Sequence, residues 1–408
     1  MNYFFITEQD PDYRPKGSRD PLGFQVIWQS MARNVIPYLS TVSSNINDFH
    51  ILGLAHLVPQ DSNFVPYFFK IEQLFGYARV ATQNQEKTRS FNGIEQVIKK
   101  WGSREEEKIQ LSDKSKDLIL SDQKTYGILG KYSRPFRDMN LRNNHEFNSL
   151  LSEKISNLKL LTSYLKSLEK KGETEICDTI TLNECSEFLK LNDKEIEFFC
   201  KVILSKSGNS GNNKLQPKFY DFLKSNELEF SNSKFYEDAI KFYENLEDKR
   251  DKEQIQKIIR TELILSRLTT LFSHLQSYQS GIITKEMIQK DAELFQSFKL
   301  SKSKYGLGFG LPKDKFSGDT DVEKRLNLFI SILEMDNPWE IALKLVEINQ
   351  VISKKRKTYP WITEESGVLR VHLRDGANEC KKFEEVANNR YFLDTYVSLF
   401  KQLNTKEN

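Results

Sequence analysis

Apolar residues recur every three or four positions along most of the chain, and this spacing is typical of one buried face of an α-helix. The first clear face has apolar positions at Phe24, Ile27, Trp28, Met31 and Val35. Asp20 and Pro21 precede this face, and these residue types are typical of an N-cap and a first helical position. Pro37 follows it and would end or distort a helix, because proline lacks the backbone N–H that a helix interior needs. The pattern therefore predicts a helix that begins at Pro21 and ends before Pro37.

The same spacing predicts helices through the rest of the chain. Their expected ranges are 45–58, 66–83, 92–101, 146–171, 181–191, 192–205, 234–246, 251–278, 284–297, 321–335, 338–354 and 389–403. Residues 45–58 are almost entirely apolar, as expected of a helix at the centre of a core. Residues 146–171 repeat leucine at three- and four-residue intervals and end before Gly172. Thr181 and Glu184 have the spacing of a capping box, which marks the start of the next helix.

Near the C-terminus the apolar spacing changes to two. In GVLRVHLRDG, residues 367–376, apolar and basic side chains alternate from Leu369 to Arg374. Alternation of this kind, bounded by glycines, predicts a half-buried strand. The expected fold class is therefore mainly α and multi-helical, with a small β element near the C-terminus.

Changes in the pattern along the chain predict three regions. Residues 1–145 form an N-terminal helical domain, and its three or four short helices before a basic segment give a winged-helix-like layout. Residues 146–300 form a helical middle domain, and residues 301–408 form a C-terminal α+β region. The chain has 408 residues, which is long enough for two or three domains.

Composition and charge narrow the class of protein. Hydrophobic residues make up 38% of the chain and aromatic residues 12%, which predicts folded cores rather than disorder. The 60 basic and 57 acidic residues leave a net charge of +3, so any site for nucleic acid must be a local patch.

Cysteine usage and the apolar runs indicate a cytoplasmic protein. Cys177, Cys185, Cys200 and Cys380 include no CxxC pair, so we expect neither a disulfide nor a zinc site. The N-terminus, MNYFFITEQD, carries two acidic residues and lacks the basic start of a signal peptide. Since no run of about 18 apolar residues occurs, no membrane-spanning helix is expected.

The most unusual stretch is QKTYGILGKYSRPFRDMNLRNNH, residues 123–145. Its basic residues are Lys124, Lys131, Arg134, Arg137 and Arg142, and they are interleaved with Tyr126, Tyr132 and Phe136. Lysine and arginine bind backbone phosphates, and aromatic faces stack on bases or sugars. The segment therefore predicts a nucleic-acid contact that tolerates many base sequences. The alternative is a solvated helix face on which the basic stems cover buried tyrosines. Proline disfavours helical backbone at the residue before it, so Pro135 predicts a chain break after Arg134.

A second basic stretch, YRPKGSRD, covers residues 13–20. Arg14, Lys16 and Arg19 lie around Gly17, directly before the first expected helix. Backbone amides at a helix N-terminus, together with basic side chains, can bind a phosphate. An ordinary loop that is tied to the first helix is the alternative, and Asp20 would repel an anion there.

Two further patterns have the residue types of nuclease sites. Arg267 and His274, and also Arg142 and His145, are spaced roughly as the arginine and histidine of helical ribonucleases. The stretch DTDVEKR, residues 319–325, combines carboxylates with a lysine, as metal-dependent nucleases do. The same acidic residues would also favour the start of a helix, because they offset its dipole.

Two stretches resemble phosphate-binding or basic motifs only in part. YGLGFG, residues 305–310, lacks the GxGxxG spacing, so we expect it to be a turn-rich connector. Because no GK[ST] motif occurs in the chain, we also expect the protein not to hydrolyse ATP. KKRK, residues 354–357, closes a helix, where positive charge is favoured by the macrodipole. The same four residues could alternatively extend a basic track on the surface.

Four segments together resemble a group of bacterial proteins. They are residues 16–49, 118–141, 360–376 and 390–403. The first contains GFQVIWQSMARNVIPYL, the second GILGKYSRPFRDMNL, the third PWITEESGVLRVHLRDG and the fourth RYFLDTYVSLFKQL. They resemble uncharacterised proteins of the kind encoded beside helicases and nucleases in anti-phage defence clusters. The resemblance implies a role in defence, and it carries no catalytic residues with it.

The leading hypothesis from the sequence is a non-catalytic, DNA-contacting subunit of a bacterial anti-phage defence system. Its expected partners are DNA and other protein subunits of a defence complex, without a cofactor and without a membrane. Two alternatives remain. One is a nuclease, either a helical ribonuclease or a metal-dependent enzyme. The other is a helical scaffold that makes no contact with nucleic acid.

Overall fold

The computed structural model describes residues 20–57, 64–82, 91–102, 109–168, 175–177, 179–205, 215–305, 320–374 and 377–404. Arg14, Lys16 and Arg19 therefore lie outside the described residues, as do residues 306–319. Tertiary contacts group the chain into two compact units. Unit 1 comprises Met1–Val35 and Leu228–Tyr391, and unit 2 comprises Ile36–Glu227 and Phe392–Asn408. The predicted mainly α fold with a small β element near the C-terminus is confirmed.

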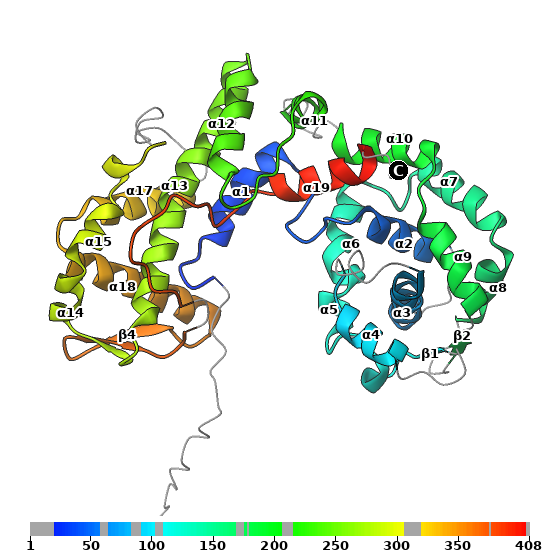
Figure 1. Cartoon of the computed structure of the whole chain (residues 1–408), viewed down its shortest axis with the longest axis horizontal. Coiled ribbons are helices and arrows are strands. Elements are labelled where there is room, and N and C mark those ends of the chain that lie inside the picture. Colours follow the sequence, from blue (N-terminus) through cyan, green and yellow to red (C-terminus); the bar gives the residue numbers. More distant parts are fainter. Residues whose placement is uncertain are drawn as a thin grey trace, which may run out of the picture. The chain divides into compact units, whose positions relative to one another are not determined.

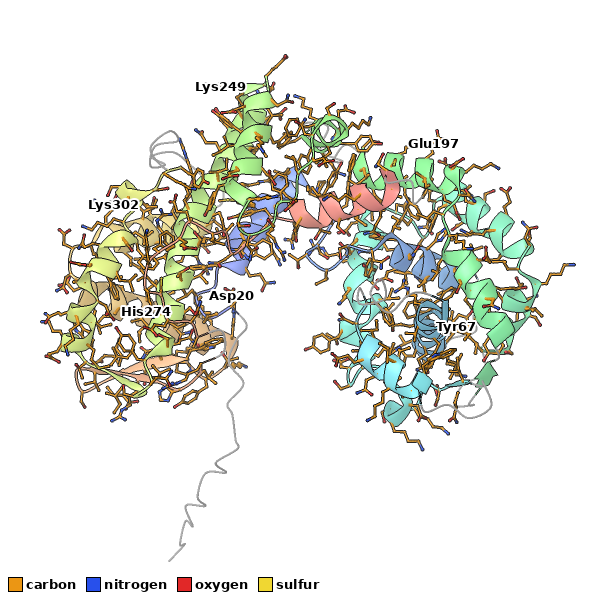
Figure 2. The ribbon with its side chains drawn as sticks, in the orientation of Figure 1. Asp20, Tyr67, Glu197, Lys249, His274 and Lys302 are labelled. Carbon is orange, nitrogen blue, oxygen red and sulfur yellow. The ribbon has the colours of Figure 1, made fainter. Side chains whose placement is uncertain are left out.

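Unit 1 is organised around one long helix, α13 (Figure 1). Its helices are α1 (Gln25–Val35), α12 (Phe235–Asn245), α13 (Lys249–Ser277), α14 (Lys285–Lys290), α15 (Ala292–Ser297), the 3-10 turn η3 (Leu300–Lys302), α17 (Thr320–Glu334) and α18 (Pro338–Arg356). Helices α1, α12, α17 and α18 all pack on α13. Figure 2 labels Lys249 at the start of α13 and His274 near its end.

A small antiparallel sheet completes unit 1. Its strands are β3 (Ile282–Ile283), β4 (Ile362–Glu365) and β5 (Val368–Val371), in the order β3-β5-β4. Ile362 pairs with Val371 across the hairpin, and Ile282 pairs with Arg370. The strand predicted from the alternation after Gly367 is thus confirmed as β5.

Unit 2 is built around α3, whose neighbours include α2, α4 and α9 (Figure 1). Its helices are α2 (Ile46–Leu57), α3 (Phe64–Thr82), α4 (Ile94–Gly102), the 3-10 turn η1 (Ser115–Asp117), α5 (Gln123–Tyr126), α6 (Ile128–Asp138), α7 (His145–Ser156), α8 (Lys159–Ser167), α9 (Thr179–Leu189), α10 (Asp193–Phe199), the π-helix η2 (Cys200–Leu204), α11 (Leu215–Ser225) and α19 (Leu393–Asn404). Strands β1 (Ile109–Leu111) and β2 (Glu175–Cys177) form an antiparallel pair.

The two units differ from the three consecutive regions expected from the sequence. Helix α1 belongs with α13 rather than with the helices that follow it, because its apolar face packs on α13. At the other end of the chain, α19 packs on η2 and α11 of unit 2. The Tyr396 hydroxyl donates to the carbonyl of Leu204 (2.6 Å), which satisfies a group at the end of the π-helix. Contacts between segments that are distant in the sequence thus assign sequence neighbours, such as α1 and α2, to different units.

Several local predictions need correction, and one example is the helix expected over 284–297, which is two helices, α14 and α15. The first helix begins at Gln25 rather than at Pro21, and the Asp20 carboxylate caps it by accepting from the N–H groups of Phe24 (2.8 Å) and Gln25 (3.1 Å). The helix expected over 146–171 is two helices, α7 and α8, which meet at residues 157–158. Pro135 causes no chain break, since it lies inside α6.

Candidate nucleic-acid interface

The basic segment 123–145 folds as α5, α6 and the start of α7. The Asp122 side chain caps α5 by accepting from the N–H of Thr125 (3.1 Å). Gly127 then joins α5 to α6 in a space that admits no side chain. A Cβ atom there would lie 2.4 Å from the Gln123 carbonyl oxygen and 2.5 Å from Glu72 Oε1. The sequence therefore needs glycine at this junction, and the junction sets the direction of α6.

Helix α6 continues through Pro135 because its apolar stripe is buried. Tyr132, Pro135 and Phe136 are all buried, and Tyr132 packs edge-on against Phe49 with ring centroids 4.9 Å apart. Burial of this stripe stabilises the helix enough to offset the backbone hydrogen bond that proline cannot make. Arg134 and Arg137 consequently lie in the second half of a helix and not at a helix start.

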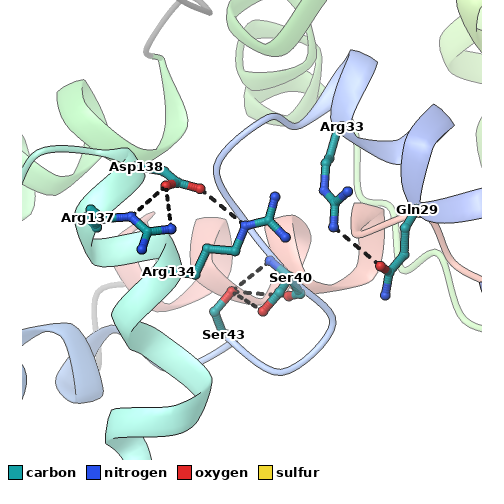
Figure 3. Close-up of polar contacts among 7 residues, drawn as sticks. All are labelled: Gln29, Arg33, Ser40, Ser43, Arg134, Arg137 and Asp138. Carbon is teal, nitrogen blue, oxygen red and sulfur yellow. Dashed lines mark hydrogen bonds and ion pairs between the residues drawn. The ribbon is translucent and has the colours of Figure 1, made fainter. Parts of the chain in front are cut away.

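Four of the five basic side chains in the segment reach the surface. Lys124, Arg134, Arg137 and Arg142 are exposed. Arg134 Nε lies 3.3 Å from Asp138 Oδ2, and Arg137 Nε lies 3.4 Å from Asp138 Oδ1, as Figure 3 shows. Exposed ion pairs of this kind contribute about 0–1 kcal/mol, so both guanidinium groups can exchange Asp138 for another anion.

The aromatic residues of the segment are mostly buried, in contrast to its basic residues. Tyr132 is buried, and its hydroxyl accepts a hydrogen bond from the N–H of Asn45 (3.0 Å). Phe136 is buried as well and stacks on His56, with ring centroids 5.5 Å apart. Tyr126 is 43% exposed. Of these three rings, Tyr126 is therefore the one placed to stack on a base, whereas Tyr132 and Phe136 build the core.

Lys131 differs from the other four basic residues because it borders a cavity in unit 2. The cavity has a volume of about 250 Å³, and Asp48, Glu72, Arg79, Phe91, Tyr126 and Lys131 are among its lining residues. These side chains come from α2, α3, the turn before α4, α5 and α6. Another wall is the turn Ser40–Ser43, drawn in Figure 3, in which the Ser43 hydroxyl accepts from the Ser40 N–H (2.9 Å).

Two carboxylates at the cavity have different environments. Asp48 Oδ1 lies 2.6 Å from Arg79 Nη2 in a buried ion pair. Glu72 makes no ion pair with any residue that the structure describes, and burial raises its pKa to about 7. The Ile128 N–H (2.6 Å) and Gln123 Nε2 (2.8 Å) donate to the Glu72 carboxylate and partly oppose that rise. At neutral pH, Glu72 is thus divided between its protonated and ionised forms.

The lysine and the arginine of the cavity also differ. Burial lowers the pKa of Lys131, and the nearby carboxylates of Asp48 and Glu72 act in the opposite direction. The Arg79 guanidinium lies 5.3 Å from the centre of the Phe91 ring, within the range of a cation–π contact. The cavity therefore combines two cations, two acids and aromatic walls, which is typical of a binding site.

Sequence reasoning placed Lys131 in a candidate site but missed Asp48, Glu72 and Arg79. All three are buried charged residues, and they lie in the two helices with the most apolar sequences, α2 and α3. A charge inside a helix that is apolar on all sides must find a buried partner or line a cavity. The presence of charged residues within otherwise apolar helices is therefore the sequence feature that could have identified Asp48, Glu72 and Arg79.

The proposed ribonuclease pair on α13 has a structural role instead. Arg267 is 1% exposed, donates to the Leu263 carbonyl (2.8 Å) and pairs with the Glu385 carboxylate. His274 is 5% exposed, and its Nδ1 accepts from the backbone N–H of Cys380 (3.2 Å). Each residue is thus enclosed by its own partners, which argues against their joint action on RNA.

His274, Asp291 and Cys380 also have the residue types of a nucleophilic triad. His274 Nε2 lies 3.3 Å from Asp291 Oδ2, and its Nδ1 is taken by the backbone of Cys380 rather than by the thiol. Burial raises the pKa of the Cys380 thiol, which is opposite to the change that activates a nucleophilic cysteine. This cluster therefore fastens the chain around Cys380 to α13.

Most of KKRK and the described part of DTDVEKR belong to helices. At the end of α18, Arg356 Nη2 lies 2.8 Å from Asp20 Oδ2, so part of KKRK contacts the chain before α1. Asp321 and Glu323 lie in the first turn of α17, where acids favour a helix start. Within the described ranges, no group of three or more His, Cys, Asp or Glu side chains could hold a metal ion.

Comparisons with known proteins add no relative to this picture. No family model, no curated protein and no solved structure matches the chain. No helix in the part of the chain that the structure describes is long and apolar enough to cross a membrane.

Proposed function

We propose that the chain is a non-catalytic, DNA-contacting subunit of a bacterial anti-phage defence system. The contact is made by the basic surface of α5, α6 and the start of α7, which we call the α6 surface. It consists of Lys124, Arg134, Arg137 and Arg142. The defence role rests on the sequence resemblance alone, whereas the contact rests on the position of these side chains.

The exposure of the two α6 arginines is the observation that carries the proposal. The Arg134 side chain is 56% exposed and that of Arg137 is 76% exposed, and they share one acidic neighbour, Asp138. Guanidinium groups with weak intramolecular partners can bind phosphate through paired hydrogen bonds. Because Tyr132 and Phe136 are buried, the contact depends on charge much more than on stacking. Such a contact tolerates many base sequences.

The salt dependence of DNA binding tests this proposal. Each phosphate contact contributes about −0.9 to the slope of log K against log salt concentration on duplex DNA. Replacing Arg134 and Arg137 together by glutamine is therefore expected to flatten the slope by about two units. The loss should be similar for unrelated duplex sequences, measured by fluorescence anisotropy at several salt concentrations.

The double variant Lys194→Gln, Lys201→Gln is a matched control in unit 2. These lysines are 69% and 68% exposed, and each has one acidic partner, Glu153 and Glu146 respectively. The control should bind duplex DNA as the unchanged protein does. Equal binding by the arginine variant and the unchanged protein would favour the helical scaffold. Cleavage of labelled DNA or RNA by the purified chain would favour a nuclease instead.

The role in defence needs a separate test in cells. Bacteria that carry the gene cluster of this chain are expected to resist phage, and resistance should fall when Arg134 and Arg137 are replaced. Efficiency of plating measures this effect, with the Lys194 and Lys201 variant as the control. Unchanged resistance after deletion of the whole chain would contradict the defence role without bearing on DNA binding.

A further inference from the structure

The cavity beside α6 is lined by one cation, Lys131, that makes no direct contact with an acid among the described residues. Asp48 and Arg79 neutralise each other in their buried pair. Lys131 is partly buried, and its ammonium group makes no hydrogen bond or ion pair with any residue that the structure describes. The Asp48 and Glu72 carboxylates are near enough to act on the Lys131 ammonium group but make no direct ion pair with it among the described residues. An anionic group near Lys131 would match its charge and regain part of the solvation that the ammonium has lost.

The walls of the cavity suit a planar ring. Phe75 and Phe91 supply aromatic surface, and Tyr126 lies at the α5 side. Asn92 adds an amide whose nitrogen donates to the Tyr126 carbonyl (2.9 Å), so its oxygen can still accept from a ligand. Aromatic walls with a few fixed polar groups are typical of sites that bind small ring-containing molecules.

The size of the cavity limits the ligand. Its volume of about 250 Å³ lies just below the range of roughly 300–1,000 Å³ that is typical of sites for drug-sized molecules. The cavity is large enough for one nucleobase, with the attached sugar and phosphate partly outside it. It is too small for a dinucleotide. The ring would lie among the aromatic walls, and the phosphate would lie at Lys131, toward the α6 surface.

We propose that this cavity binds one nucleotide unit, with its base inside and its phosphate at the Lys131 ammonium group. The proposal rests on the proposed function, because Lys131 lies on α6, the same helix that carries Arg134 and Arg137 of the α6 surface. That surface would guide a nucleic-acid backbone to the cavity. Two sources have this chemistry, namely a free mononucleotide and an unpaired nucleotide in a DNA or RNA strand. A base within a duplex is stacked and paired, so it cannot enter unless it is extruded.

The test compares three probes on the full-length protein. Adenosine monophosphate represents the free nucleotide, a labelled single-stranded DNA represents the unpaired nucleotide, and a blunt duplex represents backbone contact alone. Lys131→Gln is expected to weaken the first, the second or both by about tenfold, since a hydrogen bond to a charged group is lost. Lys131→Arg should retain most of the binding. The probe that responds identifies the source.

A second variant closes the mouth of the cavity without touching its charges. Val42 is 44% exposed in the Ser40–Ser43 turn and lines the cavity, so Val42→Trp should obstruct entry and leave the fold intact. Leu160→Trp is the matched control, because Leu160 is 47% exposed on α8 of the same unit and does not line the cavity. Only Val42→Trp should lose binding of the responding probe.

The outcomes separate this proposal from the proposed function. If neither adenosine monophosphate nor the single strand binds better than the blunt duplex, the cavity is not a nucleotide site, even if duplex binding depends on Arg134 and Arg137. Equal binding by Lys131→Gln, Val42→Trp and the unchanged protein also overturns it. If instead the responding probe behaves as expected and duplex binding ignores the two arginines, the backbone contact fails and the cavity remains.

Discussion

The central helices of the two units both carry buried polar side chains, but they use them differently. On α13 of unit 1, Glu262 accepts from the N–H groups of Asn388 (2.6 Å) and Asn389 (2.9 Å). Arg267 pairs with Glu385 on the same irregular stretch of chain. Glu262 and Arg267 therefore both fasten a segment, residues 385–389, that has no helix or strand of its own.

On α3 of unit 2, some buried polar side chains have a structural role and others line a cavity. Gln73 acts like the residues of α13, since it donates to the Ser112 carbonyl (2.7 Å) and accepts from the Ser112 N–H (3.1 Å). Glu72 and Arg79 instead border the 250 Å³ cavity together with Lys131. Buried polarity alone thus does not identify a functional site. Buried polarity that lines a cavity, with a cation that makes no direct contact with an acid among the described residues, is the more specific indication.

Removal of a buried arginine from each central helix gives the largest expected effect. Arg267→Met removes the arginine partner of the Glu385 carboxylate, and loss of a buried pair costs about 3–5 kcal/mol. Arg79→Met should cost less, about 1–3 kcal/mol, because water in the cavity can hydrate Asp48. Amide hydrogen exchange along α13 and α3 measures the free energy of opening in each unit.

The difference in opening free energy between Arg79→Met and Arg267→Met tests whether the polar groups of α3 and α13 have different roles. Exposed Arg137 provides a control, and Arg137→Met should change the opening free energy by no more than about 0.5 kcal/mol. Equal losses for Arg79→Met and Arg267→Met would mean that the cavity admits no water. In that case the polar groups of α3 would be as structural as those of α13.

The pH dependence of stability gives the next effect. Burial raises the pKa of both Glu262 and Glu72 from the ordinary value of 4.5 to about 7. Each carboxyl therefore contributes stability that is fully present below pH 4.5 and is lost as the pH rises to about 7, because the folded state then binds the proton more tightly than the unfolded state. The loss is roughly 3 kcal/mol for each carboxyl, at 1.36 kcal/mol per pKa unit.

Glutamine variants isolate these two contributions. Glu262→Gln should remove the loss of stability between pH 4.5 and 7 from unit 1, and Glu72→Gln should remove it from unit 2. Differences from the unchanged protein are used because His50 and His56, whose pKa values are lowered by burial, act in the opposite direction. NMR titration of labelled glutamate, with and without adenosine monophosphate, should show that the ligand moves the pKa of Glu72 and leaves that of Glu262 unchanged.

Most helices of both units could be predicted from apolar spacing, since each of them buries one face. The path of α6 could not, because a local rule about Pro135 is overridden by burial of Tyr132 and Phe136, which depends on distant helices. The grouping of α1 with α13 is likewise a contact between distant segments. The basic surface was visible in the sequence as a run of residues. The cavity was not, because Asp48, Glu72 and Lys131 come from separate helices.

A single methyl group at the α5–α6 junction should have an intermediate effect. In Gly127→Ala, the new Cβ would clash with the Gln123 carbonyl and the Glu72 carboxylate, and overpacking of this kind costs about 1–3 kcal/mol. Gly102→Ala is the control, since a Cβ there meets no atom within 4 Å. Thermal unfolding should show a lower midpoint for Gly127→Ala alone. A midpoint equal to that of the unchanged protein would mean that α6 can shift away from α3.

The smallest effect on stability is expected where the proposed effect on function is large. Arg134→Gln with Arg137→Gln removes two exposed pairs to Asp138, and such pairs contribute about 0–1 kcal/mol. Asp138 stays solvated after the change, so the free energy of unfolding of unit 2 should move by no more than about 0.5 kcal/mol, within the range of the Lys194 and Lys201 control. A larger loss, measured by urea unfolding at the salt concentrations of the binding experiment, would mean that these arginines support α6 itself. Weaker DNA binding by the variant would then reflect a damaged fold, and the α6 surface would resemble the structural polar groups of unit 1.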